Sequence, residues 1–435
     1  MTLHEKITEI RREKKNSALV VLFFTYTSIP ILWLCMLHPY IMQYPFLLCP
    51  LWFLLGVAQY YIVISGHEAV HKTLCFPLER NEFWGILGQS LVGVNFTAYR
   101  QQHIDHHKSS SYQEDPDAHI YMGVIRKQKG TPRLLFLTLG TFIEIIIKIR
   151  QKGSGGIGSE TRILNESIQK NMRRDSLFVI LAQLCIMFIS QQILIQYLQF
   201  FDQSYPTFEN GIVQNNWYIN TRLWLEGMWG SLYPIFHVFL SAIVGYALFW
   251  IVPLFCVTVF LNRCRIVIEH GLPLLQEHNQ ENNQENNQKM IQQEEEDILF
   301  ASSTRGKKAE KYDITHQNKS WQRSNQKPGF HKNQSQISSQ SQKGPKIPTI
   351  DIIAPKWQQI IFAPFSFNYH CTHHLFMGVP HYNLHKLHQL LREEEYQGFY
   401  CSEKGYIQSL QEIMQYDHIS LPEPIAKQDN TSNSK

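Results

Sequence analysis

The chain has 435 residues, a formal net charge of +4, and a composition that is 44% hydrophobic and 13% aromatic. Its mean hydropathy is slightly negative, but this value averages an apolar first two thirds with a strongly polar tract near residues 276–350. The eight cysteines are scattered and include no C-x-x-C pair, which argues against both a disulfide framework and a zinc ribbon. A reduced site that faces the cytosol is the simplest interpretation.

Two long runs without charge follow a basic N-terminal tail, residues 1–16. The runs cover residues 17–37 and 44–65, and each is long enough to cross a hydrocarbon core of about 30 Å. Their short connection predicts a helical hairpin. The first run is too long for an ordinary signal peptide and lacks an A-x-A-type cleavage site. The basic residues before it place the N-terminus in the cytosol by the positive-inside rule.

Two further crossings are predicted at residues 176–200 and 231–261. The connection between them contains a single basic residue, Arg222, which fits the outer side of the membrane. The apolar stretches 83–99 and 131–149 are predicted to be helices in the membrane interface, because the first is short for a span and the second carries charges. Four crossings then leave both termini in the cytosol.

The sequence therefore predicts an all-α integral membrane protein with four transmembrane helices, interfacial helices and a cytosolic helical cap. Residues 276–350 are rich in Gln, Asn, Ser and Glu and cannot bury enough apolar surface to fold, so they are predicted to be a disordered insertion. The insertion divides the membrane domain into a first part, residues 17–275, and a final part, residues 351–400. Residues 401–435 are predicted to be a C-terminal tail.

Histidines gather in three clusters at helical spacing. The segments HEAVH (67–71), HIDHH (103–107) and HCTHH (370–374) each project their histidines from one face of a helix. With 20 histidines in 435 residues, this recurrence is a poor coincidence. We infer a metal site distributed along the chain, on the cytosolic side of the predicted crossings. Its eight imidazoles are those of His67, His71, His103, His106, His107, His370, His373 and His374.

Several other residues near the clusters are candidates for supporting roles. Carboxylates accept the free N–H of ligating histidines, although the acidic turn at residues 114–119 can equally be a solvated turn. The candidates are Glu68, Asp105, Asp115, Asp117 and Glu269, with Arg100 a candidate to pair with one of these acids. The leucines of 384–391 have helical spacing and predict the amphipathic cap. His381, His385 and His388 are interpreted as surface or capping residues.

In these clusters and their flanks the chain resembles the integral-membrane fatty acid desaturase family. The similar segments are GHEAVHKTLCFPLERNEFWGILG, YRQQHIDHHKSS with a following EDPD, and NYHCTHHLFMGVPHYNLHKLH. The resemblance covers residues 45–120, 255–275 and 352–392. Two features depart from the family: the long polar insertion, and a third cluster that begins with His370 rather than Gln. The chain also lacks an HPGG heme-binding segment, which disfavours the type with a fused cytochrome.

The resemblance implies a pair of iron ions and O₂ as co-substrate. The family has a further histidine ligand after the fourth crossing, and His270 stands at that place. The implied iron ligands are therefore His67, His71, His103, His106, His107, His270, His370, His373 and His374. Imidazole suits iron, and removing hydrogen from an unactivated methylene requires a metal and O₂.

The implied activity is desaturation of a fatty acyl chain, carried by a lipid or by coenzyme A. Electrons are expected from NAD(P)H through a reductase and cytochrome b5, and the expected location is the endoplasmic reticulum membrane with the metal site in the cytosol. A lipid hydroxylase on the same scaffold is the alternative. A metal-binding transporter is disfavoured, because the predicted spans are almost free of charged residues and the clustered histidines gather just outside one face.

Overall fold

The structure is a computed structural model whose described residues are 1–13, 15–150, 165–204, 233–304 and 347–417. Residues 1–275 together with 344–435 form one compact unit, and residues 276–343 form a second. Most of the described residues are helical. Their one small sheet pairs β1 (Asp351–Ile352) with β2 (Cys401–Ser402) in parallel.

Among the described residues, four helical segments are long and apolar enough to cross a membrane: Ser17–Met36, Pro45–Val70, Glu166–Phe201 and Phe236–Glu294. They correspond to α2 (Ser17–Met36), α4 (Leu48–Val70), α9 (Glu166–Ser204) and a composite helix that begins with α11 (Tyr233–Tyr246). These segments confirm the predicted all-α membrane fold with four crossings. The second crossing differs at its end, because α4 continues through His67 instead of stopping near residue 65.

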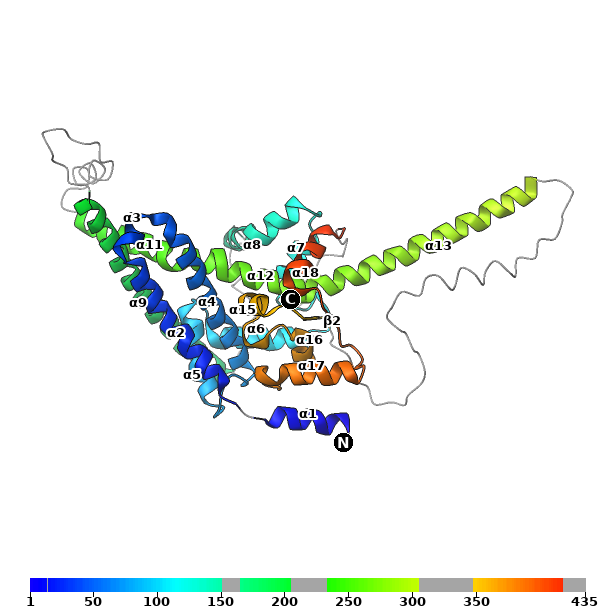
Figure 1. Ribbon diagram of the computed structural model, residues 1–435, viewed down its shortest axis with the longest axis horizontal. Helices are drawn as coiled ribbons and strands as arrows, with labels where there is room; N and C mark the ends of the chain where they lie inside the picture. The colour runs from blue at the N-terminus through cyan, green and yellow to red at the C-terminus, as the bar shows by residue number, and fades with distance from the viewer. Residues whose placement is uncertain (14, 151–164, 205–232, 305–346, 418–435) are drawn as a thin grey trace, which may run out of the picture. The chain divides into compact units, whose positions relative to one another are not determined.

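The crossings pack against one another. Helix α2 packs against α4, α9 packs against α11, and α5 (Arg80–Leu91) contacts both α4 and α9 (Figure 1). Large apolar side chains remain exposed along these helices, as on a surface that faces lipid. Examples are Phe23, Phe24 and Leu34 on α2, Leu184 and Phe188 on α9, and Phe239 on α11. Their exposure supports an integral membrane protein.

The fourth crossing contains three π-helical turns: η3 (Ala247–Ile251), η4 (Leu254–Val259) and η5 (Val267–Gly271), with α12 (Phe260–Ile266) between the last two. Pro253 separates η3 from η4, where its missing N–H interrupts the regular hydrogen-bond ladder. Such turns are frequent at functional sites, and η5 carries His270.

The stretch predicted as one interfacial helix over residues 83–99 is instead two helices, so that prediction is wrong. Helix α5 ends at Leu91 and α6 (Phe96–Lys108) begins after a short break. Gly93 lies in the break with φ of +78°, a conformation that glycine adopts readily. The Asn95 side chain then caps α6 by accepting a hydrogen bond from the Ala98 N–H. The predicted helix at 131–149 is present as α8 (Thr131–Arg150).

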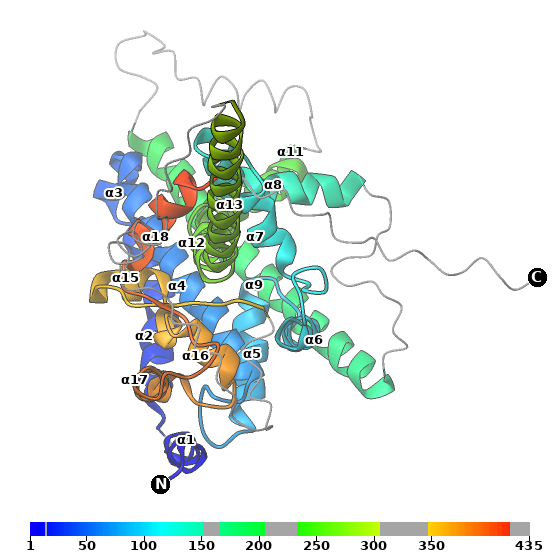
Figure 2. The same ribbon diagram turned by 90° about the vertical axis from the view of Figure 1, so that its right-hand side faces the viewer.

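The remaining α-helices in the described part of the first unit lie near its N- and C-terminal regions or connect the larger ones. They are α1 (Leu3–Arg12), α3 (Pro39–Gln43), α7 (Ala118–Ile125), α15 (Lys356–Phe362), α16 (His370–Leu375), α17 (Leu384–Glu393) and α18 (Gly405–Gln415). The amphipathic cap predicted around residues 384–391 is α17, and its buried leucines pack with residues of α1. Figure 2 shows α17 beside α1.

The tract predicted to be disordered and the predicted C-terminal tail both contain helices. Helix α13 runs from Leu272 to Thr304 and so extends into the tract predicted to be disordered, and its residues 280–294 are exposed. Extending an existing helix avoids the cost of nucleation, and Gln, Glu and Lys favour helix even where nothing packs on it. Residues 305–346 of that tract lie outside the described residues. The predicted C-terminal tail includes β2 and α18, whose Tyr406 and Ile413 are fully buried.

Candidate metal centre

The predicted histidines lie on four separate helical segments. His67 is in the last turn of α4, and His71 is its C-terminal cap residue. Helix α6 carries the second cluster and α16 carries the third. His270 lies in η5, which contacts α7 and α18. The i, i+3, i+4 spacing therefore aims each set of imidazoles from one helix face, as the sequence predicted.

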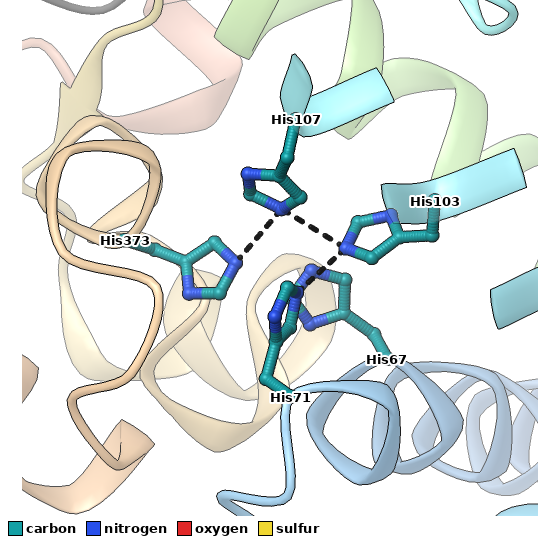
Figure 3. A group of neighbouring side chains, drawn as sticks. All are labelled: His67, His71, His103, His107 and His373. Atoms are coloured by element: carbon teal, nitrogen blue, oxygen red, sulfur yellow. Dashed lines mark hydrogen bonds between the residues drawn. The ribbon is translucent and has the colours of Figure 1, made fainter. Parts of the chain in front are cut away.

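Five of these imidazoles form one group (Figure 3). One ring nitrogen from each residue lies within 4.8 Å of those of the others, and the residues are His67, His71, His103, His107 and His373. The Nε2 atoms of His71 and His103 are 2.8 Å apart, and those of His103 and His107 are 3.0 Å apart. The His373 and His107 Nε2 atoms are 3.3 Å apart. The nitrogens thus point toward a common centre.

The other four imidazoles form a second group. Their nitrogens also lie within 4.8 Å of one another, and the residues are His106, His270, His370 and His374. The His270 and His370 Nε2 atoms are 2.9 Å apart, although 100 positions separate them in the chain. The rings of His107 and His374 stack with centroids 4.2 Å apart and so join the two groups. All nine histidines predicted as ligands are therefore brought together.

Hydrogen bonds do not satisfy all of the imidazole nitrogens in the two groups. Among the described residues, the Nε2 atoms of His67 and His374 are buried without a hydrogen-bond partner. Unpaired buried polar atoms are costly, and lone pairs directed at a metal ion would remove that cost. Two nitrogens bound at about 2.1 Å and at right angles lie about 3 Å apart, close to the separations found here. The donor set therefore fits two metal ions bound by imidazole.

The protonation states favour metal binding as well. Burial, followed by repulsion between neighbouring imidazoles, lowers the pKa of His103 and His107 well below its usual range. Burial likewise lowers the pKa of His71 to about 4. These side chains are consequently neutral near pH 7. Neutral imidazole is the form that binds a metal ion.

Asp115 supports the second group. Its Oδ1 lies 2.7 Å from His106 Nδ1, and it also accepts hydrogen bonds from the Asp117 N–H and the Tyr121 hydroxyl. Burial raises the pKa of Asp115, but its hydrogen bond with His106 and its electrostatic interaction with His106 and His270 outweigh this effect and lower the pKa overall. Asp115 is therefore a carboxylate that fixes the His106 tautomer, so that Nε2 is left for a metal.

The other predicted acids differ in their contacts. Glu68 Oε1 lies 3.2 Å from His67 Nδ1. Glu269 Oε2 is 3.5 Å from His370 Nδ1, and Asp117 Oδ2 is 3.9 Å from His106 Nδ1. Asp105 is half-buried on α6. The prediction that Arg100 pairs with one of these acids is wrong, because Arg100 pairs with Glu82 at 3.6 Å.

Sequence reasoning missed two residues beside the site. Asp351 is fully buried and accepts hydrogen bonds from the Thr372 N–H, the Thr372 hydroxyl and His388 Nδ1. It thereby anchors α16 from behind. Arg265 is also buried, pairs with Glu269 at 2.7 Å and lies 4.0 Å from the centre of the Phe367 ring. A lone acid in the apolar run TIDIIA was the available signal for Asp351.

The interpretation of the three downstream histidines is partly wrong. His385 is exposed, as expected. His388 is buried against Asp351, and His381 is buried with its Nδ1 3.7 Å from Glu68 Oε2. Both therefore belong to the packing around the site, rather than to the protein surface.

A polytopic helical membrane protein with two adjoining polyhistidine groups is the class that this fold and site define. A family model described as fatty acid desaturase matches residues 44–189 and 341–404, which include all three histidine clusters. The chain belongs to the fatty acid desaturase family. Comparison with curated proteins and with solved structures gives no significant match. Family membership makes the protein an oxidoreductase of the desaturase or hydroxylase type.

Proposed function

We propose that this protein is a membrane-bound fatty acid desaturase that inserts a double bond into an acyl chain, using O₂ and electrons from outside. The observation that carries the proposal is the convergence of nine imidazoles on two adjoining centres beside membrane-crossing helices. The proposed ligands of one iron ion are His67, His71, His103, His107 and His373. Those of the other are His106, His270, His370 and His374.

Two bound iron ions would supply the reduction of O₂ and the oxidation of an unactivated methylene pair, which no side chain can perform. The reaction balances with two electrons and two protons from outside. The –CH₂–CH₂– unit loses two hydrogens and becomes a cis double bond, and O₂ becomes two molecules of water.

The residues of the chain hold and orient the site. Asp115 and Glu68 lie beside the Nδ1 atoms of His106 and His67, which leaves each Nε2 free to bind a metal. The ligand set contains imidazoles from α4, α6, η5 and α16, so each helix must be packed correctly before the site is complete. The imidazoles are largely buried, and this burial limits access of bulk water.

The proposed electron donor is cytochrome b5 with its reductase, and the proposed location is the endoplasmic reticulum with both termini and the metal site in the cytosol. Family resemblance and the basic N-terminal tail support these assignments. The acyl substrate is proposed to reach the site as a membrane lipid or a coenzyme A ester.

Expression in a host with a simple lipid profile tests the proposal. Mass spectrometry of the host's fatty acids is expected to find a new double bond that is absent with His373→Ala. His385→Ala is the matched control, because His385 is exposed on α17 and should leave the product unchanged. The purified protein is expected to hold about two iron ions per chain. A hydroxylated product would assign a hydroxylase instead, and bound zinc without iron would contradict both.

A further inference from the structure

A cavity whose lining includes none of the clustered histidines lies beside the end of α4. Its volume is about 730 Å³, and residues from α4, α5, α6 and α9 line it together with the segment that follows His71. Ala69 forms part of its wall. Because Ala69 is two residues after His67, its side chain is about 200° around the helix from that imidazole. The cavity therefore lies behind α4 with respect to the metal centre.

One side of this cavity is cationic. Its lining includes Lys72, Arg100 and Arg174, against the acids Glu79 and Glu82. Glu82 is shared, because Arg174 Nη2 lies 2.8 Å from its Oε1 and Arg100 Nη1 lies 3.6 Å from its Oε2. Arg174 Nη2 also pairs with Asp175 Oδ1 at 2.9 Å, so its charge is balanced by two acids. Among the described residues, Lys72 and Arg100 are the lining cations that lack an ion pair shorter than 3.6 Å.

Part of this cationic side is unsatisfied. Among the described residues, Arg100 Nε is buried without a hydrogen-bond partner. Lys72 is exposed and has no ion-pair partner within the described part of the chain. The backbone of Lys72 has φ of +60°, which turns the chain sharply after His71. Donors that lack an internal acceptor are suited to an anion from outside.

The other side is apolar and faces outward. Phe83 on α5 is 61% exposed and Phe178 on the membrane-crossing α9 is 49% exposed, and Leu87 lies beside them in the lining. Phe178 lies on a helix that is long and apolar enough to cross the membrane, and Phe83 and Leu87 share the cavity wall with it. An occupant must therefore offer an anionic group to the arginines and an apolar chain to the aromatic rings.

We infer that this cavity binds an anionic phospholipid, with its phosphate against Lys72 and Arg100 and an acyl chain against Phe83, Leu87 and Phe178. Lys and Arg at a membrane surface attract anionic lipid headgroups, and the apolar wall distinguishes a lipid from a free anion. The site is separate from the proposed reaction centre. A bound lipid would tie the segment between His71 and α5 to α6 and α9, and so stabilise the connection between the first two histidine clusters.

Binding to the purified full-length protein in detergent tests this inference. The probe is dioleoyl phosphatidic acid, with dioleoylglycerol and inorganic phosphate as comparison ligands. Native mass spectrometry is expected to detect the phosphatidic acid complex, and the thermal midpoint should rise only with that lipid. The double variant Lys72→Gln/Arg100→Gln should weaken binding at least about tenfold. The matched control is Arg392→Gln, which removes an arginine from an exposed pair with Glu403 on another surface.

Each other outcome overturns the inference. Equal binding of dioleoylglycerol would show an apolar groove only, and equal stabilisation by inorganic phosphate would show an anion site only. Unchanged binding by the double variant would also contradict the assignment. If that variant does not fold, Phe83→Glu provides a second test, because a carboxylate on the apolar wall should prevent binding of the acyl chain. Iron content and product formation are measured separately, so failure of lipid binding is distinguishable from failure of the proposed desaturase.

Discussion

At the scale of single residues, the site depends on acids that touch the back of the imidazoles. Asp115 is the clearest case, since it accepts hydrogen bonds from Tyr121 and the Asp117 N–H in addition to its contact with His106. The carboxylate is held from three sides and cannot rotate away. A histidine oriented in this way presents the same nitrogen to a metal in every molecule.

Asp115→Asn is expected to lower iron affinity or activity about 10- to 100-fold, because the amide no longer balances the charge that His106 acquires on binding metal. Iron content per chain and the rate of product formation check this. Glu114→Gln is the control, since Glu114 is the exposed neighbour and its loss should change neither quantity. If Asp115→Asn kept the wild-type iron content and rate, Asp115 would not be needed to orient His106, and its role would be limited to the turn.

The burial of His381 leads us to expect that the stability of the protein depends on pH. Burial lowers its pKa to about 4 from an ordinary value of 6.5. The folded state therefore keeps His381 neutral. Neutral His381 contributes its full share of the free energy of unfolding above pH 6.5, and this contribution is lost as the pH falls toward 4. The loss amounts to roughly 3 kcal/mol.

His381→Gln should make the acid side of the stability curve shallower by about that amount. The thermal midpoint between pH 7 and pH 4 is the measurement, with the exposed His385→Gln as the control. If His381→Gln lost stability as steeply as the wild type, another buried group would have to carry the acid dependence.

At the scale of elements, α4 packs closely against the fourth crossing. This packing helps to position His67 on α4 and His270 on the fourth crossing near each other. Gly56 makes this approach possible. A Cβ atom at residue 56 would lie 2.4 Å from the Val257 Cβ and 2.8 Å from the Pro253 carbonyl oxygen. Thr258 also donates a hydrogen bond to the Gly56 carbonyl. Helix contacts in membranes often depend on such small residues.

Gly56→Ala should force α4 and η4 apart and cost about 1–3 kcal/mol of stability. A lower thermal midpoint in detergent, with reduced iron content, would be the expected result. Gly88→Ala on α5 is the matched control, because its Cβ would lie 3.1 Å from the nearest atom, the Tyr26 hydroxyl oxygen. The packing argument fails if the two variants melt at the same temperature.

Helix α16 is positioned by an element that comes directly after the polar tract. Asp351 in β1 binds Thr372, which lies between two residues of the third cluster. The β1 strand is in turn fixed by pairing with β2. Residues 276–343 form a separate unit, and the pairing of β1 with β2 fixes the position of the chain after the first unit resumes. The third cluster then takes the same place in every molecule.

At the scale of the whole molecule, the contacts of the N-terminal helix α1 indicate on which side of the membrane the N-terminus lies relative to the histidine site. Asn383 donates a hydrogen bond to the Ile10 carbonyl, and Lys386 pairs with Glu13. Lys6 pairs with Glu394 at 2.7 Å. These contacts hold α1 against α17, close to the third histidine cluster. The N-terminus and the site must therefore lie on the same side of the membrane.

Tags placed at the N-terminus and after residue 435 are both expected to be cleaved by protease added to sealed microsomes. Four crossings return the chain to its starting side, and the basic N-terminal tail favours the cytosol. A tag inserted between α9 and α11 should be protected until detergent is added. Opposite behaviour of the two terminal tags would be incompatible with four crossings.

The sequence by itself determined the four crossings and the three histidine clusters. Both depend on local spacing: an uncharged run must exceed the bilayer thickness, and residues at i, i+3 and i+4 share one helix face. The break between α5 and α6 also has a local signal in the sequence, because Gly93 favours a turn and Asn95 favours a helix N-cap. The apolar residues around them led to the prediction of a single helix. The family followed from the same short segments.

Only the tertiary structure decided how nine imidazoles divide into groups of five and four. It also decided that Asp351 lies behind α16 and that His388 is buried against it. The physical reason is separation along the chain. His270 meets His370 across 100 positions, and no local periodicity specifies a contact between helices that far apart. Such contacts depend on how whole helices pack, and packing is a property of the folded chain.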